Sequence, residues 1–382
     1  MKAIVNGIIL TEQGDVTGKA LLFDDRFRGI VDADALTDEE IIDARGHYVA
    51  PGLVDVHIHG YLGEDTSDGS EEGIRTIARG ILANGVTSFL PTTMTVDWAE
   101  LENAFAVVRR LMPFSRTEDF DGAEILGCHA EGPFINPQRK GAQSADHILP
   151  PQADRLLAHR DIVRIVTMAP EMPGGIDFIK QVTGSSDIVV SIGHSSASYD
   201  QALEAIRAGA SHITHLFNAM TGLNHREPGI VGAALTTDVY AELIADAFHV
   251  HSGLFSLLHV AKGDRLVLVT DCTRAGGLPD GEYTLGGQPI YVKGIESRLQ
   301  DGTIAGSVLH LNDAVRNLYQ LGGVSMRDAV HAASLSAARS IGADDRKGSI
   351  REGKDADFVL MDGNCQVYAT YVGGVRKYAK EN

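Results

Sequence analysis

Six side chains of the types that bind divalent metals stand at the ends of strand-like apolar runs. They are a His-x-His pair, a glutamate, two further histidines and an aspartate, namely His57, His59, Glu131, His194, His215 and Asp271. Imidazole nitrogen and carboxylate oxygen are ligand types that zinc and ferrous iron prefer. A metal held by three protein ligands lowers the pKa of a bound water from 15.7 towards about 7, which makes hydroxide available at neutral pH. The set predicts a metal-dependent hydrolase, with Glu131, His194 and His215 at the core of its site.

Each of these residues, taken alone, is more often a hydrogen-bonded structural group than a metal ligand. Their joint occurrence on five different runs favours one common site, because independent structural residues have no reason to gather at one rim. The period-2 alternation of a strand points His57 and His59 to the same face. His129 lies deeper in its run, and we assign it to packing or to support of the site. His212 lies three residues before His215, and we expect it to face the helices.

The runs that carry these residues alternate with amphipathic helical patterns through the middle of the chain. We expect strands at 54–59, 86–92, 124–131, 162–169, 188–194, 212–217, 241–249 and 266–271. We expect helices at 72–84, 98–111, 199–208, 253–262, 312–321 and 326–340. This alternation predicts a parallel sheet, and eight such units fit an α/β fold with a closed, TIM-like (β/α)8 barrel of roughly 250 residues. The competing fold, an open doubly wound sheet, would have a G-x-G-x-x-G turn after its first strand, and none is present.

The two ends of the chain have a different texture, with short strand-like pieces separated by glycine and aspartate turns. Neither end offers enough strands for a stable sheet of its own. We therefore expect residues 1–53 and 345–382 to join into one small β-sandwich domain, beside a hydrolase barrel formed by residues 54–344.

The composition excludes several kinds of partner. The 382 residues include 33 Lys and Arg against 51 Asp and Glu, a net charge of -18. Such an acidic chain argues against nucleic acid or an anionic membrane as a partner, so an anionic substrate would need a local basic pocket. The amino terminus has neither the long apolar region nor the cleavage site of a signal peptide, and no window approaches a membrane span. Three scattered cysteines do not make a disulfide framework, so we expect a cytoplasmic protein.

Several segments resemble known motifs. APGLVDVHIHG at positions 50–60 resembles the first-strand motif of the amidohydrolase superfamily, and GSIREGKDADF at 348–358 resembles its carboxyl-terminal signature. Within that superfamily, HAEGPF at 129–134, GHS at 193–195, THLFNAM at 214–220 and REPG at 226–229 resemble the N-acetylglucosamine-6-phosphate deacetylase family. The likeness extends over essentially the whole chain.

The resemblance implies roles for the metal-binding residues. Residues that match Glu131, His194 and His215 bind one divalent metal in that family, and the residue that matches Asp271 is the catalytic acid and base. The pair His57 and His59 is absent from some members and can hold a second metal in others. The implied cofactor is thus zinc or iron, one or two ions per chain. Related barrel hydrolases that bridge two metals with a carbamylated lysine need a Lys at the end of the fourth strand. That strand has none here, so Glu131 would supply any bridge.

The resemblance also implies the substrate, N-acetylglucosamine 6-phosphate, whose acetamide would be hydrolysed. It assigns Asn218, the backbone of Ala219, Arg226 and His249 to the sugar phosphate, with Arg226 and His249 often crossing the interface of a homodimer. Gln143 resembles a sugar contact, although other members carry His there.

Three alternatives stay open for the activity. The chain could be a deacetylase of the galactosamine epimer, since a few hydrogen bonds to the sugar 4-hydroxyl separate the epimers. It could be a deaminase or another amidohydrolase. A scaffold protein without catalysis is the third alternative, but that reading predicts lost ligands, and every candidate ligand is present.

Overall fold

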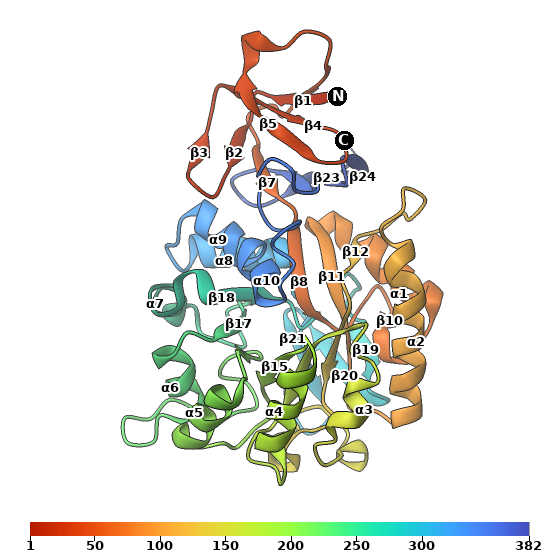
Figure 1. Ribbon diagram of the computed structural model, residues 1–382, viewed down its shortest axis with the longest axis vertical. Coiled ribbons are helices and arrows are strands. Elements are labelled where there is room, and N and C mark those ends of the chain that lie inside the picture. The colour runs from red at the N-terminus through yellow and green to blue at the C-terminus, as the bar shows by residue number, and fades with distance from the viewer. Residues whose placement is uncertain (382) are drawn as a thin grey trace.

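A closed barrel of parallel strands forms the larger part of the computed structural model, which describes residues 1–381 (Figure 1). Its strands are β8 (Leu53–Ile58), β11 (Val86–Thr93), β13 (Cys128–Glu131), β14 (Val163–Met168), β15 (Val189–Ile192), β16 (His212–Ile213), β17 (Tyr240–Ile244) and β18 (Leu266–Val269), hydrogen-bonded in that order. The short β12 (Glu124–Ile125) also pairs with β11. The segment after β18 closes the barrel onto β8: His59 N donates to Cys272 O at 2.9 Å, and Asp271 N donates to His57 O at 2.8 Å. The predicted barrel is confirmed.

Helices cover the outside of the barrel. They are α1 (Glu71–Gly80), α2 (Trp98–Phe114), α3 (Ala153–Leu157), α4 (Gly175–Ser185), α5 (Tyr199–Ala208), α6 (Gly229–Thr236), α7 (Phe255–Lys262), α8 (Leu311–Gln320), α9 (Met326–Ala332) and α10 (Leu335–Ser340). Helix α5 has the bounds expected from the sequence, because Ser198 and Gln201 form a capping box at its start. The single helix expected over 326–340 is divided into α9 and α10. Among residues 1–381, no helix has the length and apolar character needed to cross a membrane.

The two ends of the chain meet in one small β domain at one end of the molecule (Figure 1). Strands β5 (Phe27–Asp32), β4 (Lys19–Phe23), β1 (Lys2–Val5) and β6 (Glu40–Asp43) form one sheet in that order. Strands β24 (Val375–Ala379), β23 (Val367–Val372), β22 (Phe358–Met361), β7 (Tyr48–Pro51), β2 (Ile8–Leu10) and β3 (Asp15–Val16) form a second. Phe23, Phe27, Phe358 and Tyr371 are buried together between strands of both ends. The β-domain prediction is thus confirmed, while its limits at 53 and 345 stay predictions.

A buried charge cluster joins the β domain to the barrel. Lys347 Nζ lies 2.5 Å from Glu124 of β12, 2.6 Å from Asp357 and 3.0 Å from Asp355. Burial raises the pKa of Glu124, but Lys347 and Arg346 more than offset this effect and hold the pKa below its ordinary value.

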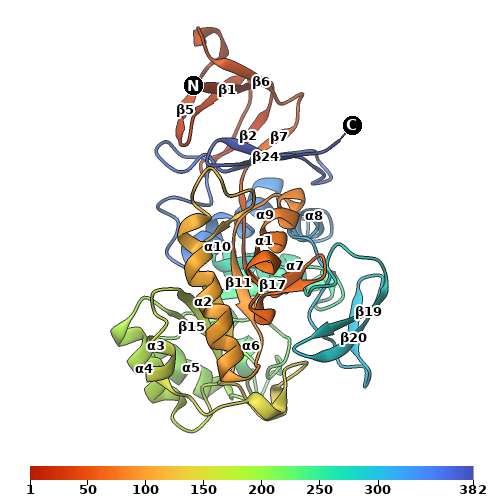
Figure 2. The same cartoon turned by 90° about the vertical axis from the view of Figure 1, so that its right-hand side faces the viewer.

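One element was not expected from the sequence. Strands β19 (Gly281–Leu285), β20 (Gln288–Lys293) and β21 (Glu296–Leu299) form an antiparallel sheet between β18 and α8, at the side of the barrel (Figure 2). Gln288 Nε2 donates to Ala142 O at 2.7 Å, so this sheet is tied to the segment 132–147 that follows β13. Leu285 of β19 also lines the pocket described below.

Candidate metal centre

All six candidate ligands meet at the carboxyl-terminal rim of the barrel, and all are buried. His57 lies in β8 and Glu131 ends β13. His194, His215 and Asp271 lie just beyond their strands, in backbone with positive φ of 48°, 27° and 50°. The sequence predicted longer strands that include these three residues. The strands end earlier because the chain turns at the rim, a turn that needs the left-handed region of backbone conformation.

The first group of ligands comprises Glu131, His194 and His215. Glu131 Oε1 lies 3.2 Å from His194 Nε2 and 3.1 Å from His215 Nε2, and the two nitrogens are 3.1 Å apart. Three atoms at these separations can all lie about 2.0–2.1 Å from one zinc-sized ion. The carbonyl of Arg139 can only accept, so His194 Nδ1 is the donor to it at 2.8 Å, which leaves the Nε2 lone pair free. This donor set fits a divalent metal.

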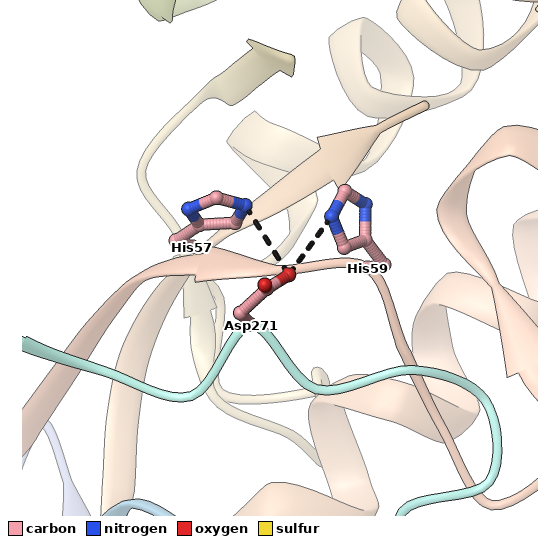
Figure 3. A group of neighbouring side chains, drawn as sticks. All are labelled: His57, His59 and Asp271. Atoms are coloured by element: carbon pink, nitrogen blue, oxygen red, sulfur yellow. Dashed lines mark ion pairs between the residues drawn. The ribbon is translucent and has the colours of Figure 1, made fainter. Parts of the chain in front are cut away.

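The second group comprises His57, His59 and Asp271 (Figure 3). Asp271 Oδ1 lies 3.5 Å from His57 Nε2 and 3.2 Å from His59 Nε2. His59 Nδ1 faces the carbonyl of Thr92 at 3.2 Å and must donate to it, so Nε2 is the nitrogen that faces the site and offers a lone pair once it loses its proton.

Glu131 lies between the two groups. Its Oε1 is 3.4 Å from His57 Nε2, and its Oε2 is 3.3 Å from His59 Nε2. One carboxylate therefore reaches the ligand atoms of both groups. Strand β14, the fourth of the barrel, ends at Met168 and offers no lysine. Glu131 would therefore be shared by both groups if each held a divalent metal.

The histidines and carboxylates at this rim shift one another's pKa values. Burial lowers the pKa of His59, but the carboxylates of Asp271 and Glu131 raise it to about 9. Burial raises the pKa of Asp271, but His57 and His59 lower it to about 2. Ionised carboxylates and protonated imidazoles at one rim leave the site able to exchange protons for a divalent cation.

Two histidines lie beneath the rim. His129 Nδ1 faces Val56 O at 3.0 Å and its Nε2 faces Thr167 Oγ1 at 2.7 Å, so both nitrogens are engaged, in keeping with the assignment to packing. The prediction for His212 was wrong. Its Nδ1 lies 3.2 Å from Ser191 Oγ, a hydroxyl that also bonds Thr214 inside the barrel. His212 and Thr214 are two residues apart, and residues at that spacing share one face of a strand.

Glu242 is a residue of the site that the sequence reasoning missed. It is fully buried in β17, with its carboxylate 2.8 Å from His57 Nδ1. A glutamate within the apolar run AELIA could have drawn attention, because a buried carboxylate needs a specific partner.

A pocket of about 340 Å³ opens above the two groups of ligands. Of the residues expected to bind substrate, Gln143, Asn218, Ala219 and His249 line it, together with Arg139, which was not expected. Arg226 does not line the pocket, and it stands exposed on the loop before α6.

The segment 48–377 matches the model of the amidohydrolase family. The chain belongs to this family. It is 40% identical to an N-acetylglucosamine-6-phosphate deacetylase of Bacillus subtilis, over 85% of this chain and 83% of the relative. It is 36% identical to an N-acetylgalactosamine-6-phosphate deacetylase of Escherichia coli O157:H7, over 96% of both chains. The crystal structure of an N-acetylglucosamine-6-phosphate deacetylase from Pasteurella multocida superimposes with a TM-score of 0.93 at 30% identity, over 99% of this chain and 100% of the other. Amidohydrolases depend on metals, which agrees with the two ligand groups at the rim.

Proposed function

We propose that this amidohydrolase removes the acetyl group of N-acetylglucosamine 6-phosphate, giving glucosamine 6-phosphate and acetate. The observation that carries the proposal is the pair of ligand groups joined by Glu131 at the base of a 340 Å³ pocket. An amide needs a strong nucleophile, a polarised carbonyl and a proton for the departing amine, and this rim offers groups for each. The Bacillus subtilis relative supports the choice of substrate.

Zinc or ferrous iron, one or two ions per chain, would be held by Glu131, His194 and His215 and by His57, His59 and Asp271. A bound divalent ion supplies an acidic water and a Lewis acid for the carbonyl. Asp271 takes the proton of the attacking water and later gives a proton to the amine nitrogen as the C–N bond breaks. Gln143 holds Glu131 Oε2 through its Nε2 at 2.5 Å.

The sugar phosphate would lie at the outer part of the pocket, against Asn218, the backbone of Ala219 and His249. Asp246 Oδ2 accepts a hydrogen bond from His249 Nδ1 at 2.6 Å, so His249 Nε2 points away from Asp246. Because Arg226 is exposed and does not line this pocket, we propose that it completes the phosphate site of a second chain in a homodimer. An arginine fork suits phosphate, since it donates two parallel hydrogen bonds.

Cytoplasmic activity is part of this proposal, and the cysteines support it. Cys128, Cys272 and Cys365 are all buried as free thiols, as expected in a reducing compartment. A second candidate substrate is N-acetylgalactosamine 6-phosphate, favoured by the Escherichia coli relative that aligns over 96% of both chains.

The test is acetate release from both N-acetyl sugar phosphates, measured on protein purified without chelators. Higher kcat/KM for the gluco epimer supports the proposal, and higher kcat/KM for the galacto epimer replaces it with the second candidate. Glu131→Gln is the control, because it should abolish metal binding and activity without unfolding the protein. Inactivity of the metal-loaded parent on both sugars would refute both candidates.

The shared phosphate site is tested by mixing two impaired variants. Glu131→Gln chains should be inactive and Arg226→Ala chains weakly active, and the mixture should be more active than either alone, because each hybrid dimer would contain one intact composite site. Arg226→Ala should also lower kcat/KM for the phosphorylated sugar by roughly 10- to 150-fold, the value of a charge-assisted hydrogen bond, with little change for the unphosphorylated sugar. Equal losses on both sugars would contradict the assignment.

A further inference from the structure

Glu242 is a carboxylate buried inside the barrel, beneath the metal-binding groups. It lies in β17 with no exposed surface, and among the described residues its ion-pair partners are only His57 and His212. Neither Lys nor Arg compensates its charge. A buried carboxylate without a strong cationic partner is costly to fold, and an apolar residue would suit this strand better. Its presence therefore points to a task other than stability.

One oxygen of Glu242 contacts both ligand groups of the metal centre. Oε2 accepts from His57 Nδ1 at 2.8 Å and from the backbone N–H of His215 at 2.9 Å. The contact holds a proton on His57 Nδ1, so Nε2 is the nitrogen that faces the site and offers a lone pair once it is deprotonated. That Nε2 has no hydrogen-bond partner among the described residues, and it lies 3.4 Å from Glu131 Oε1 and 3.5 Å from Asp271 Oδ1.

The second hydrogen bond of Glu242 Oε2 is to the backbone N–H of His215. His215 has a φ of 27°, which an L-residue rarely adopts, and its N–H points at the carboxylate of Glu242 rather than at a neighbouring strand. The oxygen that sets the ring of His57 thus also holds the turn that presents His215.

We propose that Glu242 is a positioning residue: it orients His57 as a metal ligand and couples the second ligand group to the first through His215. The proposal rests on the metal centre of the proposed function. Hydrogen-bonded carboxylates behind ligating histidines fix the ring and its tautomer, and their loss costs about 10- to 100-fold in metal affinity or activity.

The test compares Glu242→Met, which removes both acceptors, with Glu242→Gln, which keeps a neutral acceptor of the same shape. Zinc binding is measured without substrate, as ions per chain and as affinity from competition with a chelator. We expect Glu242→Met to weaken the second zinc ion by about 10- to 100-fold, with a smaller loss in Glu242→Gln. Glu124→Gln is the matched control, a buried glutamate of the same barrel whose ion-pair partners are Arg116, Arg346 and Lys347, and it should bind zinc as the parent does.

A double-mutant cycle separates positioning from general support of the fold. If Glu242 acts through His57, then adding Glu242→Met to His57→Gln should cause little further loss of zinc affinity. Fully additive losses, or parent-like zinc binding in Glu242→Met, would overturn the proposal. These zinc measurements need no turnover, so a parent that binds zinc but does not deacetylate would refute the proposed function and leave this test intact.

Discussion

Gln143 hydrogen-bonds to Glu131 in the pocket, with its Nε2 2.5 Å from Oε2 of the carboxylate that lies between the two ligand groups. Its amide oxygen accepts from the backbone N–H of Thr95 at 2.6 Å, so the side chain is held at both ends. The resemblance to the deacetylase family predicts a sugar contact at this position. The structure adds a contact with Glu131, the carboxylate proposed to bind metal, so Gln143 links the segment 132–147 to the proposed metal centre.

Gln143→Ala should therefore weaken metal binding as well as catalysis. The change removes a hydrogen bond to an ionised carboxylate and frees Glu131 to rotate, so we expect a loss of about 10- to 100-fold in zinc affinity or kcat. Zinc competition and kcat on the metal-saturated variant should be measured together. If only KM for the sugar rises, Gln143 is a sugar contact alone. Gln138→Ala is the control and should bind zinc normally, because Gln138 lines the same pocket but is exposed.

Asp271→Asn should slow turnover by roughly 10²- to 10⁴-fold, the usual effect of one positioned acid–base group. The ion held by Glu131, His194 and His215 should remain, because those ligands do not include Asp271. Metal content and kcat must be determined on one preparation. An unchanged kcat would reassign Asp271 to a structural role.

The meeting of these residues at the rim could be predicted because strand ends are visible in the sequence. His194, His215 and Asp271 each follow an apolar run, and in a barrel such positions converge whatever the details of the strands. Their positive φ values were not visible, because no glycine or asparagine marks them. The proposed roles of these residues remain predictions.

The interior of the barrel and its side sheet were harder to predict. Glu242 and His212 are polar residues at buried positions inside the barrel, where apolar residues are usual. Each is an isolated position, so no repeating sequence pattern predicts it. Strand β19 buries only Leu285, so its alternation is faint. Strand β20 alternates in burial, but the exposed Tyr291 stands between Ile290 and Val292, so its sequence reads as a continuous apolar run. The pairing of β7 with β22 joins residues about 300 positions apart and was not predicted. The sequence predicts only that the two ends join, because each end alone has too few strands.

Zinc binding should release protons near neutral pH. The carboxylates of Asp271 and Glu131 raise the pKa of His59 to about 9 despite its burial. Its imidazole is therefore protonated at pH 7.5 and must lose that proton to ligate a metal. Zinc affinity should therefore rise with pH up to about 9 and fall on acidification. Calorimetry in buffers of different ionisation enthalpy counts the protons released. His59→Gln should release fewer than the parent, and binding with no proton release at pH 7.5 would contradict the pKa of His59.

Lys347→Met should destabilise the protein by about 3–5 kcal/mol, because it leaves buried carboxylates without their cation. Lys347 is 2% exposed and lies within 3.0 Å of Glu124, Asp355 and Asp357. In the parent the pKa of Glu124 is lowered, so its contribution to stability is present above pH 4.5 and is lost as pH falls through its folded pKa. Asp357 has the opposite effect on the pH dependence of stability. Burial raises its pKa even beside Lys347, so its contribution is lost as pH rises through its folded pKa.

Removal of Lys347 should raise the pKa of both carboxylates, and protonation would then relieve their repulsion. The deficit of the Lys347→Met variant relative to the parent should thus be largest near pH 8 and shrink towards pH 5. Urea unfolding of both proteins at matched pH and zinc concentration measures it. Lys354→Met is the matched control, because Lys354 is equally buried but donates to Lys347 O and Ser349 Oγ rather than to carboxylates. Its deficit should stay constant with pH, and a constant deficit for Lys347→Met as well would show that packing, rather than charge, sets the stability of this junction.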